Sequence, residues 1–138
     1  VYRASGDPTD STEFLHFAVP ASGLARRPDG SAFAPGDSVL ITITVTDPTR
    51  LIARFEPAGL QFSRGNPAEL SISYEHADPD LDGDGDIDEG DSFVEQRLRI
   101  WRQANPGAPW HAIPSALFGT IEEIEGGIFG FSSYAVAF

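Results

Sequence analysis

The chain has 138 residues with neither cysteine nor methionine, and its formal net charge is −12. This length suits one domain, and a hydrophobic content of 41% excludes a disordered chain. The negative charge argues against nucleic acid and anionic membranes as partners, and no apolar run approaches the roughly 20 residues that a membrane-spanning helix needs. We therefore expect neither nucleic-acid binding nor membrane insertion.

The lack of methionine bears on where the protein is found. A chain that starts at Val1 and holds no methionine is expected to be a processed protein or a fragment. Removal of an N-terminal secretory signal fits this composition. We therefore expect an extracellular or cell-surface protein.

The first residues differ in composition from the rest of the chain. Residues 1–12 are polar apart from Val1 and Tyr2, and we expect them to form an arm ahead of one domain that spans residues 13–138. Residues 13–19 are apolar on both faces and predict a fully buried strand.

Period-two alternation runs through most of the remaining chain. Residues 38–46 place aliphatic side chains on one face and threonines on the other, which is typical of a strand. Residues 97–102 place Leu98 and Ile100 inward, and residues 110–113 follow after a turn as the expected hairpin partner. Four other segments give similar strand signals: 51–55, 69–74, 119–124 and 133–138.

No segment shows a helical period, and glycine and proline interrupt the chain at short intervals. Many short strands separated by turns are typical of two packed antiparallel sheets. We therefore predict an all-β fold, a single antiparallel β-sandwich.

Residues 80–91, with the sequence DLDGDGDIDEGD, place acidic side chains at regular positions. Numbered from Asp80, carboxylates fall at positions 1, 3, 5, 7, 9 and 12, with glycine at 6 and isoleucine at 8, which is the spacing of an EF-hand calcium loop. Gly85 permits the backbone turn, and Ile87 is expected to point into the protein and anchor the loop. The predicted calcium ligands, by side chain or backbone carbonyl, are Asp80, Asp82, Asp84, Asp86, Asp88 and Asp91.

The aspartate at position 12, where glutamate is commoner, makes this loop resemble that of dockerin modules. Because residues 71–74 and 97–102 on either side read as strands, we expect a calcium loop inserted between strands and not between helices. Hard oxygen ligands without neighbouring cysteine or histidine ligands favour calcium over zinc or copper. Magnesium and a metal-free, solvated acidic turn are the alternatives. We expect the ion to lock the loop.

Five short motifs after residue 38 occur in the order found in bacterial ZU5-like domains, and this part of the chain resembles that family. The resemblance implies an immunoglobulin-like β-sandwich of extracellular and cell-surface proteins, with roles in assembly and interaction and none known in catalysis. No ligand residues carry over from it. The motifs are FEPAGLQFS at 55–63, PAELSISY at 67–74, LRIW at 98–101, WHAIP at 110–114 and FSSYAVA at 131–137.

Candidate catalytic groups are sparse, and we expect no enzyme. No nucleophile motif accompanies the three histidines, His16, His76 and His111. A carboxylate pair for glycoside hydrolysis would have to come from Glu122, Glu123 or Glu125, and a solvated strand edge explains these residues more simply.

The tryptophans have two interpretations. Trp101 and Trp110 lie on segments expected to be adjacent strands, where they either pack against neighbours or form an exposed aromatic platform for sugar. Packing is the expected role.

Together these features favour a non-enzymatic extracellular structural protein. We expect a calcium-stabilised β-sandwich subunit that binds copies of itself through strand and edge contacts, as in a surface fibre. The alternative is an adhesin module of a larger surface protein that binds a cell-surface glycan or protein.

Overall fold

The computed structural model describes residues 13–138, and the predicted arm, residues 1–12, lies outside the described residues. The described part contains eleven strands and one helix. In chain order they are β1 (Leu15–Ala18), β2 (Leu24–Arg26), β3 (Thr42–Asp47), β4 (Ile52–Glu56), β5 (Gln61–Phe62), β6 (Ala68–Ser73), α1 (Glu89–Glu95), β7 (Arg99–Gln103), β8 (Trp110–Ala112), β9 (Ser115–Phe118), β10 (Glu123–Ile128) and β11 (Ser133–Ala137).

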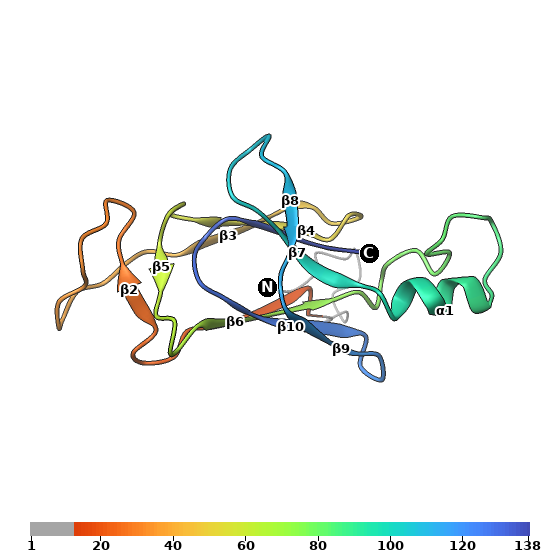
Figure 1. Cartoon of the computed structure of the whole chain (residues 1–138), viewed down its shortest axis with the longest axis horizontal. Helices are drawn as coiled ribbons and strands as arrows, with labels where there is room; N and C mark the ends of the chain where they lie inside the picture. The colour runs from red at the N-terminus through yellow and green to blue at the C-terminus, as the bar shows by residue number, and fades with distance from the viewer. Residues whose placement is uncertain (1–12) are drawn as a thin grey trace, which may run out of the picture.

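Two antiparallel sheets face each other and form a β-sandwich, as predicted (Figure 1). One sheet has the order β1-β6-β10-β9, and the other has the order β3-β4-β11-β7-β8. The short ribbon of β2 and β5 lies at one end of the sandwich, and α1 with the loop before it projects from the opposite end (Figure 1). No helix of residues 13–138 is long and apolar enough to cross a membrane.

Alternation along the strands matches the two environments that a sheet offers. In β3 the threonines are exposed, whereas Ile43 and Val45 pack against the core, which confirms the predicted faces. Leu98 and Ile100 are buried, and β7 pairs with β8 in the expected hairpin. Its register places Trp101 opposite Ala112.

Two predicted strands differ from the structure. The segment 13–19 does not form a fully buried strand, because β1 lies at the edge of its sheet and exposes His16. The segment 119–124 is mostly a turn, in which Glu122 takes a left-handed conformation with φ of 51°, and β10 starts only at Glu123. Alternation within one segment does not reveal whether its strand lies at an edge, because the order of strands in the folded sheet determines which strands are at the edges.

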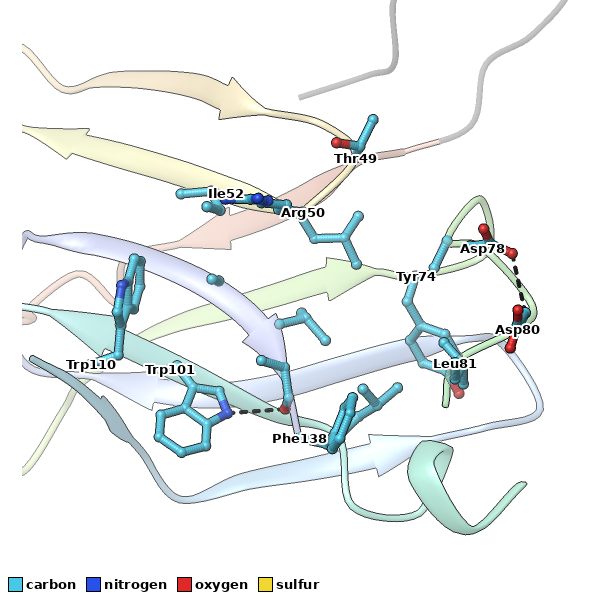
Figure 2. A pocket seen from close by; sticks show the side chains of 16 residues that line it. Thr49, Arg50, Ile52, Tyr74, Asp78, Asp80, Leu81, Trp101, Trp110 and Phe138 are labelled. Carbon is cyan, nitrogen blue, oxygen red and sulfur yellow. Dashed lines mark hydrogen bonds between the residues drawn. The ribbon is translucent and has the colours of Figure 1, made fainter. Parts of the chain in front are cut away.

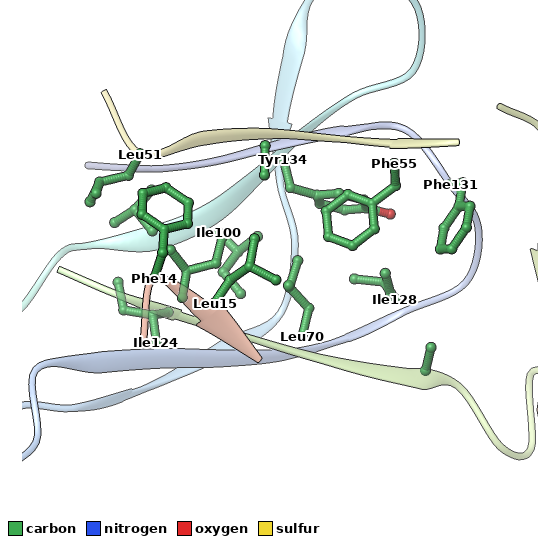
Figure 3. Close-up of a cluster of buried hydrophobic side chains, with 14 of the residues drawn as sticks. Phe14, Leu15, Leu51, Phe55, Leu70, Ile100, Ile124, Ile128, Phe131 and Tyr134 are labelled. Carbon is green, nitrogen blue, oxygen red and sulfur yellow. The ribbon is translucent and has the colours of Figure 1, made fainter. Parts of the chain in front are cut away.

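Aromatic side chains form much of the core between the sheets (Figure 3). The ring of Phe55 lies 5.4 Å from those of Phe17 and Phe131 and 5.5 Å from that of Tyr134. The Tyr134 hydroxyl donates a hydrogen bond to the Gly130 carbonyl, so this buried polar group is satisfied. These contacts join β1, β4 and β11 across both sheets.

The predicted absence of helix is wrong at α1. The Asp88 side chain caps this helix by accepting a 2.6 Å hydrogen bond from the Gly90 N–H. It also accepts from the Asp91 N–H, and the Asp91 side chain accepts a 2.8 Å bond from the Asp88 N–H, which completes a capping box. Only Val94 and Asp91 of the helix are buried. A helix of seven residues with so few inward positions has no periodic signal to detect.

We predict that Phe55→Ala lowers the free energy of unfolding by about 3–5 kcal/mol, because it removes a fully buried ring and leaves a cavity. Urea denaturation measures the change. Phe129→Ala is the matched control, since the Phe129 side chain is 53% exposed and its loss should cost about 0.5 kcal/mol or less. Equal losses in the two variants would contradict the described core.

Candidate metal centre and adjoining groove

The loop between β6 and α1 brings three carboxylates together. Ligand atoms of Asp80, Asp82 and Asp84 all lie within 4.8 Å of one another, and the three residues could hold a metal ion. Asp80 is half-buried, whereas Asp82 and Asp84 are exposed. Each carboxylate oxygen has two lone pairs, so one that accepts an N–H bond can still face a cation.

The backbone wraps around Asp80. Its two carboxylate oxygens accept hydrogen bonds from the N–H groups of Gly83 at 2.9 Å and Gly85 at 3.0 Å. Both glycines have positive φ, 77° and 96°, which a residue with a Cβ rarely adopts. The glycines of the motif therefore permit the tight turn that gathers the aspartates.

Asp91 ties the two ends of the loop together. This buried carboxylate accepts hydrogen bonds from the N–H groups of Leu81 at 2.6 Å, Asp82 at 3.3 Å and Asp88 at 2.8 Å. The bond from Asp88 and those from Asp82 and Leu81 outweigh burial and hold the pKa of Asp91 below its usual value. Asp91 thus has a structural role whether or not a metal is bound.

The structure gathers three of the six predicted ligands in one group. Asp88 caps α1 and Asp91 bonds to the backbone, while the Asp86 N–H donates to Asp84 at 3.0 Å. The sequence interpretation missed that the chain enters the loop from β6 but leaves it in a helix, which starts at position 10 of the loop. The capping pattern of Asp88 with Asp91 is the signal that could have revealed this helix.

Ile87 does not anchor the loop. Its side chain is 72% exposed, so the prediction that it points into the protein is wrong. The neighbouring core is already closed by other side chains, with Tyr74 and Leu98 both 5% exposed. The loop is instead held by hydrogen bonds to aspartates.

The loop carries strong negative charge. Eight of the chain's 21 acidic residues lie between residues 78 and 91. A bond from the Asp84 N–H favours ionised Asp82, yet burial and the negative charges of Asp84, Asp91 and Asp80 together raise the pKa of Asp82. A donor set of carboxylates and carbonyls fits a hard divalent cation, which would neutralise this repulsion.

A groove lies next to the loop, between β4 and β11. Strand β11 pairs with β7 as far as Ala137, but it pairs with β4 only at Ser133 and Tyr134. The strands part where Leu51, just before β4, takes a left-handed conformation with φ of 52°. A cavity of about 570 Å³ opens there, lined mainly by apolar side chains (Figure 2).

Both tryptophans line this groove. They are half-buried on the adjacent strands β7 and β8, and the Trp101 Nε1–H donates a 3.0 Å hydrogen bond to the Ala137 carbonyl. Ile52 lies across from Trp101 and Phe138 (Figure 2). Asp80 and Leu81 of the loop also line the groove, so the candidate metal centre and the groove share a wall.

The residues considered for catalysis do not converge. The three histidines are exposed and separate, with His16 on β1, His76 in the turn after β6 and His111 on β8. His16 lies 3.6 Å from Glu13. Burial, a hydrogen bond with Glu69 and the charges of Glu69 and Glu123 raise the pKa of Glu125. Within residues 13–138, Asp80, Asp82 and Asp84 form the one group suited to metal binding.

Comparison with known proteins identifies no relative. No protein-family model, no curated protein and no solved structure matches the chain.

We predict that Asp91→Ala lowers the melting temperature even in excess chelator, because three backbone N–H groups lose their acceptor. Thermal unfolding followed by circular dichroism measures the shift. Asp86→Ala also removes an acidic side chain from this loop, but one that is exposed, and it should leave the melting temperature almost unchanged in chelator. If both variants melt alike, Asp91 does not hold the loop.

Proposed function

We propose that this protein is a calcium-stabilised structural subunit of an extracellular assembly, which binds copies of itself through strand and edge contacts. The observation that carries the proposal is the edge strand β3, which has six residues and no charge before Asp47. Soluble sandwiches commonly protect such an edge with charged residues, proline or a bulge. Asp47 and a register shift against β4 between Val45 and Asp47 protect only the end of β3, so its Thr42–Val45 part can accept a strand from a neighbour.

The backbone of β3 supports this reading. The Phe55 N–H, on β4, donates to the Ser132 carbonyl at 3.0 Å, so Phe55 directs its backbone groups away from β3. Ile43 is the register partner of Phe55 on β3. In an antiparallel pair, a residue opposite such a partner directs its own N–H and C=O outward. Ile43 therefore offers its backbone groups to an incoming strand.

Exposed apolar side chains near the loop support a role in association. Phe93 on α1, Phe118 on the edge strand β9 and Ile121 in the next turn are 67%, 43% and 60% exposed. The turn lies near the helix, because Glu95 of α1 approaches Gly119 as well as bonding to Tyr74. Scattered apolar residues are common on surfaces, but several at one end of a sandwich favour a contact surface.

Calcium is the cation proposed for the loop, with Asp80, Asp82 and Asp84 as the side-chain ligands and Asp86, Asp88 and Asp91 completing the predicted set. Support comes from the gathered carboxylates, the two left-handed glycines and the helix that starts at position 10. When bound, the ion supplies positive charge that fixes the connection between the two sheets. The resemblance to ZU5-like domains agrees with an extracellular location for such a module.

We predict that chelation lowers the melting temperature of the wild-type protein. We also predict that Asp82→Asn changes the melting temperature in opposite directions with and without calcium. In calcium the substitution removes a ligand charge and should lower the melting temperature. In chelator the substitution should raise the melting temperature at neutral pH. The raised pKa of Asp82 means that its negative charge is repelled in the folded state, and the asparagine removes that charge. That gain should vanish below about pH 4, the unfolded pKa, where the wild-type carboxyl is protonated as well.

Differential scanning calorimetry at several pH values tests the sign change. Magnesium in place of calcium tests the identity of the ion, since its stricter octahedral geometry should give a smaller shift. If calcium changes the melting temperature of neither protein, the loop is a solvated acidic turn.

We predict that Thr44→Lys abolishes self-assembly and leaves the fold intact, because Thr44 is exposed and a lysine on an edge strand opposes pairing with another chain. Size-exclusion chromatography and negative-stain microscopy in calcium measure assembly. Thr120→Lys is the matched control, with the same charge change in an exposed turn away from β3. A wild-type protein that stays monomeric under these conditions would refute the proposed assembly.

A second candidate function is an adhesin module. Trp101, Trp110 and Phe138 line a groove whose size suits a small ligand such as a sugar. Binding of a glycan or protein there is the alternative to assembly.

A further inference from the structure

A second cavity, the inter-sheet pocket, lies between the two sheets on the side of the sandwich that carries β5. It has a volume of about 400 Å³ and is lined by residues of both sheets and of the segment before β5, among them Leu60, Arg102, Ile128, Phe131 and Tyr134. None of its described lining residues also lines the groove beside the acidic loop, so the two cavities are separate.

Arg102 lines this pocket from the inner face of β7. Its register partner on β11 is Tyr134, which is fully buried. Residues directly opposite each other in an antiparallel pair place their side chains on the same face of the sheet, so Arg102 lies on the face that packs against the other sheet. Among residues 13–138, it is the only charged residue that lines the pocket.

Arg102 differs from the other arginine that the fold partly buries. Only Arg27 and Arg102 are half-buried among the arginines of residues 13–138, and Arg27 pairs with Asp37 at 2.6 Å. No ion pair of the described residues includes Arg102. A charge that loses water without gaining a counter-ion is costly, so partly buried charges are normally paired. Arg102 therefore offers a positive charge to an anion from outside the described chain.

Two hydroxyls lie close to this charge. The Tyr134 hydroxyl donates to the Gly130 carbonyl and points toward the end of the core that holds Ile128 and Phe131 (Figure 3). Burial raises the pKa of Tyr134 to about 12, and the nearby Arg102 and Ser132 act in the opposite direction. The buried Ser132 hydroxyl has no hydrogen-bond partner among residues 13–138. This end of the core thus contains both an unpaired cation and an unsatisfied hydroxyl.

The other walls of the pocket are mainly apolar and are held in place by the backbone. Leu60, Ile128 and Phe131 are buried, whereas Ile113 is half-buried and lies nearer to solvent. The Phe131 N–H donates to the Leu60 carbonyl at 2.9 Å, which joins the β10–β11 turn to the segment before β5. A preformed apolar cavity with one charged group suits a small ligand that has an apolar body and one ionised group.

A carboxylate suits this pocket better than a phosphate. A guanidinium can bind either group through two parallel hydrogen bonds. One guanidinium balances one negative charge, and a phosphate monoester carries about 1.5 to 2 charges at neutral pH. The excess charge would be repelled by a protein whose formal net charge is −12. An inorganic ion would also leave the apolar walls uncovered.

We propose that the inter-sheet pocket binds a small organic monocarboxylate, whose carboxylate pairs with Arg102 and whose apolar body packs against Ile128 and Phe131. This site goes beyond the proposed assembly and depends on neither β3 nor calcium. It also differs from the adhesin alternative, which uses the groove lined by the tryptophans.

An NMR titration with phenylacetate tests the proposal, and phenylacetamide is its uncharged match. We expect the wild-type protein to bind phenylacetate about tenfold or more tightly than phenylacetamide, because only the carboxylate pairs with the guanidinium. Arg102→Gln should abolish this difference. Arg97→Gln is the matched control, with the same charge change at an exposed residue outside the pocket, and it should preserve the difference.

Nuclear Overhauser contacts locate the probe in the wild-type protein, so the test does not depend on the folding of a variant. The ring protons of phenylacetate should contact the methyl groups of Ile113 and Ile128. Contacts only with residues outside the pocket, no saturable binding of phenylacetate, or equal affinity for phenylacetamide would overturn the proposal. Displacement of phenylacetate by an equal concentration of inorganic phosphate would overturn the assignment to monocarboxylates.

The two proposals fail separately. The titration needs neither calcium nor assembly, whereas Thr44→Lys reports on β3 in the assembly. Carboxylate binding by a protein that never assembles would support the pocket and refute the proposed function.

Discussion

The hydrogen bonds to the buried carboxylate of Asp91 hold the connection between the two sheets. The chain leaves one sheet at the end of β6 and joins the other at β7, and everything between them is loop and one short helix. Asp91 bonds to Leu81 and Asp82 near the start of this connection and to Asp88 at the start of the helix. A single side chain therefore joins the start of the acidic loop to the start of α1.

That placement explains why the loop can carry so much charge. Backbone N–H groups donate to several aspartates, so hydrogen bonds within the loop define its shape. Burial and the negative charges of Asp84, Asp91 and Asp80 together raise the pKa of Asp82 in this loop. Preorganisation and residual repulsion both favour a cation, because binding then costs little ordering and relieves charge.

The strands with clear alternation could be predicted from the sequence, since a sheet with one buried face imposes a period of two on residues such as Ile43, Val45, Leu98 and Ile100. The spacing of the aspartates predicted six ligands, of which the structure gathers Asp80, Asp82 and Asp84. Helix α1 escaped detection because capping by Asp88 and Asp91, not an apolar face, accounts for it. The position of Ile87 was wrong because it was inferred from a motif that normally lies between two helices. The groove has no sequence signal, since it arises where Leu51 and Val136, far apart in the chain, fail to meet.

The acidic segment and its helix satisfy most of their own hydrogen bonds, from Asp80 with Gly83 and Gly85 to the capping box of α1. They join the sandwich only at one end, and Val94 is the only apolar residue of the helix that is buried. Such a unit is close to modular. A shorter link between β6 and β7 could replace it without redesign of the sheets, and the same unit could be grafted between strands of another sandwich.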